Sequence, residues 1–261
     1  MKEAIEKEKV EYLLEEEEEK VEIAYELGKA MLKFGGETYR VEDIINKTLE
    51  FYKIKSSSFA VLNTIIISVE FSKLRKESKV LRISERSINL KKVDQLNNLA
   101  RNLNLYSLEE IREQIREINE RKDVNNFKKF LGNILVGGAF AILFSGNLND
   151  SFVAVISTIY LRIMDVLYSK IKLNSFFINF LGGAVTTINS IFFYRMGVIE
   201  NISISIISAL MLLVPGISFT NSIRDIIAED FVSGISRIVE AVVVGIALAS
   251  GSGVILSIFY I

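Results

Sequence analysis

The sequence contains no cysteine, no histidine and no tryptophan, and it has a single proline. Without cysteine and histidine, the chain can form no disulfide, no Ser-His-Asp triad and no Cys/His zinc site. The 31 basic and 32 acidic residues give a net charge of −1, whereas nucleic-acid-binding domains usually carry a basic surplus. We therefore predict no cofactor, no resident metal and no nucleic-acid partner.

Charge is unevenly distributed along the 261 residues. Residues 1–129 hold 25 of the basic and 25 of the acidic residues, although they make up only half of the chain. The mean hydropathy of +0.33 is thus an average over a polar half and a very apolar half. This division predicts a cytoplasmic domain at 20–129, after an acidic lead-in at 1–19, and a transmembrane helical domain at 130–261.

The second half consists of apolar stretches separated by short polar interruptions. A membrane-spanning helix needs about 20 mostly apolar residues. We predict an all-α bundle of about five spanning helices, at 130–146, 152–168, 176–194, 202–219 and 235–258. The polar N-terminus has no apolar signal-peptide region, so the first half is expected to stay in the cytoplasm.

The distribution of lysines predicts the orientation of these spans. Lys128 and Lys129 precede the first span, and Lys170 and Lys172 follow the second, whereas the loop 145–150 carries no lysine or arginine. Positively charged loops favour the cytoplasmic side of a membrane. We expect a multi-pass protein of the cell (inner) membrane with a cytoplasmic N-terminus and, after five spans, an outside C-terminus.

Pro215 lies inside the fourth predicted span and precedes Gly216, a pair that predicts a kink or a break. Polar and charged residues follow it: Thr220, Asn221, Arg224 and Asp225. Thr220 or Asn221 could cap a new helical segment, whose N-terminal amides would favour an anion. Alternatively, the span ends at 219 and an ordinary cytoplasmic loop follows.

Two pairs of opposite charge lie within the predicted spans at i, i+3 spacing: Arg162 with Asp165, and Arg237 with Glu240. Residues at this spacing share a helix face and can neutralise each other. Ionisable residues in spans usually face a bundle interior or a water-filled path. Arg162 lies about 15 Å into its span, which makes it a candidate to bind an anionic substrate. Arg237 is nearer the cytoplasmic end, which favours snorkelling.

The spans are also rich in small residues, which allow helices to approach closely in lipid. They favour packing within the chain or against a partner bundle or a second copy. Thr186, Thr187, Asn189 and Ser190 form a polar belt that either joins helices or lines a pathway.

The first half alternates between helical and strand periodicity. Helical spacing ends at Gly35-Gly36 and resumes over 39–52. Strand signals follow at 59–62, 65–71 and 80–83, and further helices at 89–104 and 108–121, the last opened by a Ser107–Glu110 capping box. This order predicts an α+β domain with a small, mainly antiparallel sheet.

The segment 35–43 is the one candidate for a chemical site in this domain, because Gly35, Glu37, Arg40 and Glu42 lie close together in the sequence. It has neither P-loop nor dinucleotide-binding spacing. A helix C-cap followed by a helix N-terminus accounts for it. The alternative is the carboxylate site of a membrane-anchored hydrolase.

Two segments resemble the threonine/serine exporter family. ELGKAMLKFGGETYRVEDIINKTLEFY has its Gly-x-x-x-x-Arg-Val-Glu run, and LVPGISFTNSIRDIIAEDFVSGISRIVEA has its Leu-Val-Pro-Gly, Thr-Asn, Arg-Asp and Ser-Gly elements. The resemblance extends over residues 20–260. The residues that match it are Gly28, Gly35, Glu37, Arg40, Val41, Glu42, Pro215, Gly216, Thr220, Asn221, Arg224, Asp225, Asp230, Gly234 and Arg237.

The resemblance implies an exporter of threonine and serine or, in split members, of succinate-like dicarboxylates, and not an enzyme. Because the sequence stops at 261, it is similar to the large subunit of the split type and implies a small multi-span partner subunit. We expect Arg224, and with it Arg162, to bind the carboxylate, and Asp225 or Asp230 to couple export to an ion gradient. A regulatory or scaffold subunit with a gating cytoplasmic domain is the alternative.

Overall fold

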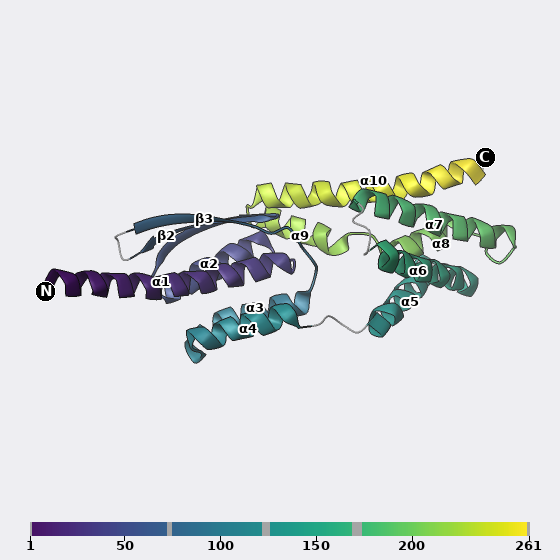
Figure 1. Ribbon diagram of the computed structural model, residues 1–261. Coiled ribbons are helices and arrows are strands. Elements are labelled where there is room, and N and C mark those ends of the chain that lie inside the picture. The colour runs from purple at the N-terminus through teal and green to yellow at the C-terminus, as the bar shows by residue number, and fades with distance from the viewer. Residues whose placement is uncertain (1, 72–74, 122–125, 169–173, 260–261) are drawn as a thin grey trace. The chain divides into compact units, whose positions relative to one another are not determined.

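The computed structural model describes residues 2–71, 75–121, 126–168 and 174–259 (Figure 1). The chain forms two compact units. Unit 1 comprises Met1–Lys122 and Thr220–Arg237, and unit 2 comprises Asp123–Phe219 and Ile238–Ile261. The segment 220–237 therefore belongs with the N-terminal residues, although the sequence separates it from them by about a hundred positions. The boundaries predicted from charge, which concern membrane insertion, stay predictions.

The elements of unit 1 follow the predicted order of two helices, three strands and two helices. They are α1 (Lys2–Lys33), α2 (Thr38–Phe51), β1 (Lys55–Val61), β2 (Thr64–Phe71), β3 (Arg75–Arg82), α3 (Leu90–Arg101), the 3₁₀ helix η1 (Leu103–Leu105) and α4 (Leu108–Glu120). Helix α1 includes the acidic run that the sequence suggested as a separate lead-in. The Ser107–Glu110 capping box at the start of α4 is confirmed, with both of its hydrogen bonds present.

The three strands form an antiparallel sheet in the order β1-β2-β3. In β2, Ile65, Ile67, Val69 and Phe71 are buried, while the residues between them are more exposed. This alternation is the period of a half-buried strand. Strands β1 and β3 begin several residues earlier than predicted, because they pair with β2 along polar stretches that carry no apolar signal.

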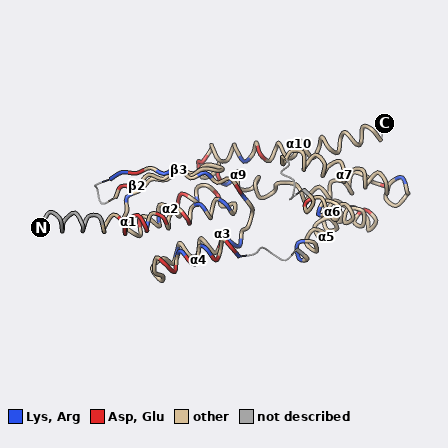
Figure 2. Tube along the Cα trace, viewed as in Figure 1, with Lys and Arg blue, Asp and Glu red and all other residues tan. Residues whose placement is uncertain are grey.

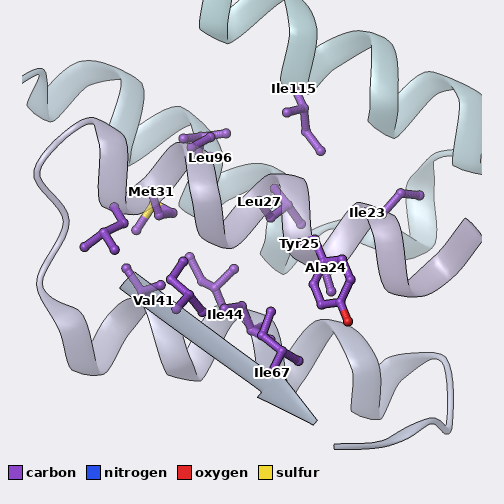
Figure 3. Packing of buried hydrophobic residues seen from close by; sticks show 14 of the residues in the cluster. Ile23, Ala24, Tyr25, Leu27, Met31, Val41, Ile44, Ile67, Leu96 and Ile115 are labelled. Atoms are coloured by element: carbon purple, nitrogen blue, oxygen red, sulfur yellow. The ribbon is translucent and has the colours of Figure 1, made fainter. Parts of the chain in front are cut away.

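The core of unit 1 lies between the helices and the sheet (Figure 3). Ile23, Leu27 and Met31 of α1 pack with Ile44 of α2 and Ile67 of β2. Full burial of a large aliphatic side chain stabilises a fold by about 1.5–3 kcal/mol, so this cluster is the main source of stability in unit 1.

Unit 2 is helical and carries few charges (Figure 2). It contains α5 (Asn126–Leu143), α6 (Leu148–Tyr168), α7 (Ser175–Arg195) and α8 (Ile202–Leu210); α9 (Gly216–Ile227) and α10 (Phe231–Phe259) each contribute residues to both units. Among the described residues, α7 and α10 are long and apolar enough to cross a membrane. Only 22% of the apolar stretch of α10 is buried, against 50% for α7. The other three predicted spans stay predictions, and Lys170 and Lys172 lie outside the described residues.

The predicted break at Pro215 is present. Helix α8 ends at Leu210, and α9 begins at Gly216 after an intervening turn. The first backbone bond of the new helix runs from the Phe219 N–H to the Pro215 carbonyl (3.0 Å). The prediction that Thr220 or Asn221 caps the new segment is wrong, because both lie in the second turn of α9.

Polar and small residues join the helices of unit 2. Asn189 Nδ2 of α7 donates to Ser157 Oγ of α6 (2.8 Å), and Ser190 contacts Ser205 of α8 (3.0 Å). A Cβ atom on Gly251 of α10 would lie 1.9 Å from the Phe180 carbonyl oxygen of α7. The belt on α7 is therefore interhelical at these two positions, and α7 and α10 pack closely at a glycine.

Candidate functional site

The turn between α1 and α2 is fixed by two glycines. Gly35 has a φ of +86°, and the N–H groups of Gly35 and Gly36 donate to the carbonyls of Leu32 (3.2 Å) and Met31 (3.0 Å). This pattern is a Schellman motif, which favours glycine at its left-handed position. The predicted helix cap at this turn is confirmed.

The carbonyls of the same two glycines receive side chains from the far end of unit 1. Asn221 Nδ2 of α9 donates to the Gly35 carbonyl (3.2 Å), and Arg237 Nη2 of α10 donates to the Gly36 carbonyl (3.0 Å). These contacts join residues that are 186 and 201 positions apart in the sequence. The two segments singled out in the sequence thus meet in one place.

Glu37 holds two arginines beside this turn. Its Oε1 lies 2.8 Å from Arg224 Nη1, and its Oε2 lies 3.3 Å from Arg40 Nε. The Glu37 side chain is only 7% exposed, whereas those of Arg40 and Arg224 are 42% and 53% exposed. The buried carboxylate therefore lies beside two half-exposed guanidinium groups, which leaves a local charge of +1. Arg40 Nε also donates to the Tyr39 hydroxyl (3.1 Å). We call Arg40 and Arg224 the arginine pair.

Asp225 and Arg237 form a second ion pair, and it is buried. Arg237 Nε lies 2.9 Å from Asp225 Oδ2, with side chains 5% and 0% exposed. The distance is that of an ion pair, but the Nε–H is not aligned for a hydrogen bond to the carboxylate. Burial raises the pKa of Asp225, and the charge of Arg237 opposes that rise. The prediction that Arg237 snorkels is wrong, because its guanidinium is held inside unit 1.

Two further carboxylates complete this charged cluster. Asp230 accepts from the Thr38 hydroxyl (2.6 Å) and from the Ser233 N–H at the start of α10 (3.2 Å). Glu42 accepts from the Ala60 N–H (2.6 Å). Burial raises the pKa of Glu42, the Ala60 hydrogen bond opposes the rise, and the charge of Asp230 adds to it.

A separate candidate site lies in unit 2. A cavity of ≈ 550 Å³ is lined by residues of α5, α6 and α7 and by Leu212 and Leu213, which follow α8. Arg162 and Asp165 line it and form the predicted i, i+3 ion pair.

Gly216 has no neighbouring atom within 4 Å of an added Cβ, so packing does not require glycine at that position.

The structure thus assembles most of the predicted site residues in unit 1 and places Arg162, Asp165, Pro215 and Gly216 in unit 2. Thr220 is exposed near the start of the unit 1 portion of α9. No sequence pattern indicated Thr38 in the cluster or Lys129 and Asn133 at the cavity. A threonine at a helix start and polar residues at a helix end are ordinary features of local sequence, and only the distant contact distinguishes them.

The exposed apolar helix α10 and the buried polar junctions of unit 2 are those of a helical membrane protein. Within that class, the chain belongs to the threonine/serine exporter family. A family model described as "Putative threonine/serine exporter" matches residues 22–259, which include both segments of the charged cluster. Membership implies a membrane exporter of the threonine/serine type and a transporter, not an enzyme. Neither the curated proteins nor the solved structures gave a match.

Proposed function

We propose that this chain exports small carboxylates across the cell membrane and that the arginine pair binds the substrate carboxylate on the cytoplasmic side. The carboxylates are threonine or serine or, alternatively, a succinate-like dicarboxylate. The observation that carries this proposal is the geometry of Glu37, which holds Arg40 and Arg224 side by side while leaving both about half exposed.

The chemistry of arginine supports this role. A guanidinium has five N–H donors in a planar fork that matches a carboxylate. The contact of Arg224 with Glu37 is through Nη1, so a guanidinium held there still presents donors to an incoming carboxylate. Glu37 also orders the two long side chains before the substrate binds, which lowers the entropy lost on binding.

The buried pair Asp225–Arg237 supports a role in coupling export to a proton gradient. A carboxyl group with a raised pKa takes up a proton more readily than an ordinary one, and protonation of Asp225 would release Arg237 from its partner. Asp230 is the second candidate. The break at Pro215 and Gly216 precedes Asp225 of α9 and would act as the gating element, as discontinuous helices do in many transporters.

We also propose that the chain works with a second, small multi-span membrane subunit. Added Cβ atoms on Gly245 and Gly253 of α10 would meet nothing within 4 Å, and several large apolar side chains of the same helix are exposed. Small residues on an apolar helix allow another helix to approach closely. A second copy of this chain is the alternative occupant. In this arrangement the N-terminus is cytoplasmic and the C-terminus is outside.

Efflux from preloaded cells tests the arginine pair. Cells that express the chain and its partner are loaded with labelled threonine, serine or succinate, and the rate of release is compared among variants. We expect Arg224→Gln to abolish release above the vector background while the amount of inserted protein stays unchanged. Arg224→Lys, which keeps the charge but not the fork, should retain a fraction of the rate.

Arg116→Gln is the matched control, since it removes an exposed i, i+3 ion pair with Glu113 in the same unit. It should release substrate at the wild-type rate. Wild-type release by Arg224→Gln would overturn the assignment of Arg224. Absence of release by the wild-type chain for all three substrates, with both proteins inserted, would favour the regulatory subunit.

A further inference from the structure

The cavity of unit 2 has a charged end. Helices α5 and α6 are joined by residues 144–147 and pack against each other, with Ser151 Oγ of α6 donating to the Gly138 carbonyl of α5 (2.7 Å). In such an antiparallel pair, the start of the first helix and the end of the second lie at the same end. Lys129 from the start of α5 and Asp165 from the end of α6 both line the cavity and mark this end.

The inner part of the cavity is apolar. Val136 of α5 and Leu161 of α6 line it about one to two turns farther from the charged end. A Cβ atom added to Gly182 of α7 would lie 2.7 Å from Leu213 Cδ1 and 3.4 Å from Leu161 Cδ2, so the two leucines meet beside this glycine. The volume of ≈ 550 Å³ is within the range of about 300–1,000 Å³ that is typical of ligand sites. A cavity that is charged at one end and apolar inside fits an amphiphile.

The charged side chains that line the cavity sum to +1. Arg162 and Asp165 form an ion pair, with side chains that are 20% and 68% exposed, and Lys129 adds a second cation. Lys129 and Arg162 also interact with other groups of the chain, which hold the two cations in place. Because lysine has three N–H donors and arginine has five, each can keep such contacts and still donate to an anion. A ligand with a single negative charge would neutralise the site.

We propose that this cavity binds one anionic phospholipid, whose phosphodiester interacts with Lys129 and Arg162 and whose acyl chains lie along the apolar walls. The single negative charge of a phosphodiester matches the +1 of the site, and Asn133 at the same cavity supplies a further donor. This inference rests on the proposed membrane insertion of α5 and α6 and not on the substrate of the exporter. In the proposed topology, the charged end faces the cytoplasmic leaflet, where basic pockets between spanning helices bind anionic lipid headgroups.

The apolar surface of the same two helices favours a lipid over a free phosphate ion. Leu131 and Leu135 of α5 and Ile163 of α6 are exposed, so acyl chains that leave the cavity would still contact apolar side chains. A phosphate ion would occupy the charged end alone and leave the inner part of the cavity without a ligand group. The lipid uses both parts of the cavity.

Lipid binding by the full chain in detergent tests this inference without a transport measurement. The delipidated protein is titrated with phosphatidylglycerol, and native mass spectrometry gives the dissociation constant of the most tightly bound molecule. We expect Lys129→Gln to weaken binding about 5-fold, the share of one basic residue in the attraction of an anionic lipid, and Lys129→Arg to retain it. Lys128→Gln is the matched control, because Lys128 is exposed and lies outside the lining of the cavity.

The substitution Gly132→Leu tests the location of the lipid. Gly132 lines the cavity, and an added Cβ would meet nothing within 4 Å. A leucine there would occupy the cavity without a clash, so we expect it to abolish binding while the helical content and the unfolding temperature stay at their wild-type values. Gly253→Leu is the control, because its Cβ position on α10 is equally open and lies outside the cavity.

Four results would overturn the inference. Equal weakening by Lys129→Gln and Lys128→Gln would indicate general attraction of lipid to a basic surface. Wild-type binding by Gly132→Leu would place the lipid elsewhere on the protein. Displacement of the lipid by millimolar inorganic phosphate would identify a free anion as the ligand. Absence of tight binding by the wild-type chain would remove the site altogether. None of these results bears on export, which the release of labelled substrate from loaded cells tests separately.

Discussion

Replacement of Arg237 by glutamine is the sharpest perturbation of the charged cluster. In the wild-type chain, Arg237 is 5% exposed and Asp225 is 0% exposed. Among the described residues, neither carboxylate oxygen of Asp225 has a well-aligned hydrogen-bond donor. Arg237 is its ion-pair partner, and Thr38 also favours the charged carboxylate. The substitution also removes the hydrogen bond to the Gly36 carbonyl. It therefore leaves a buried negative charge without its ion-pair partner.

The expected cost is large because both groups are buried. Removal of one member of a buried ion pair typically destabilises a protein by about 3–5 kcal/mol. Because both side chains of this pair are buried, solvent does not screen their interaction. For a chain of this size, that corresponds to a fall in the unfolding temperature on the order of 10 °C. The double variant Arg237→Gln/Asp225→Asn also removes the buried charge of Asp225 and should recover most of the lost stability.

Thermal unfolding in detergent, followed by circular dichroism, measures these differences. Hydrogen exchange over residues 35–38 should locate the loosening at the turn that Arg237 holds. Arg224→Gln is the control from the same cluster. Arg224 is 53% exposed, and its partner Glu37, although buried, keeps its contact with Arg40 in this variant. We therefore expect a smaller loss of stability than in Arg237→Gln. An Arg237→Gln chain as stable as Arg224→Gln would refute the reasoning.

Two further predictions concern packing and pH. Gly251→Ala places a Cβ 1.9 Å from the Phe180 carbonyl oxygen and should lower the unfolding temperature. The control Gly253→Ala, whose Cβ meets nothing within 4 Å, should be neutral or slightly stabilising. Equal effects of the two substitutions would contradict the close packing of α7 and α10. Burial raises the pKa of Glu42 above its usual 4.5, so the folded state binds a proton at this carboxyl more tightly than the unfolded state does. The contribution of Glu42 to the free energy of unfolding therefore increases as the pH falls from above the raised pKa toward 4.5. Glu42→Gln should remove that part of the slope in a plot of unfolding free energy against pH, and an unchanged slope would show that the carboxyl is not perturbed.

Local signals in the sequence predicted most of unit 1. The alternation from Ile65 to Phe71 identified the central strand, and the spacing of Ser107 and Glu110 identified the start of α4, because both patterns are complete within a few residues. The early starts of β1 and β3 were missed, since their first residues are polar and only pairing with β2 makes them strands.

The contacts within the charged cluster could not be predicted from local sequence patterns. The resemblance to a family identified Glu37, Arg224 and Asp225 as residues of interest but gave none of their partners. The i, i+3 spacing of Arg237 and Glu240 suggested a local pair but gave no indication of Asp225, with which the structure pairs Arg237. Distant contacts of this kind leave no mark on periodicity or composition, and they decide which charges are buried.

Transport by the purified chain is the most direct test of the central claim. The chain and its partner are reconstituted into proteoliposomes, a pH gradient is imposed, and accumulation of labelled threonine, serine and succinate is followed. We predict gradient-driven accumulation of at least one of these carboxylates, its loss in Arg224→Gln, and a change of its pH dependence in Asp225→Asn. Accumulation of none of the three, with both proteins correctly inserted, would contradict it.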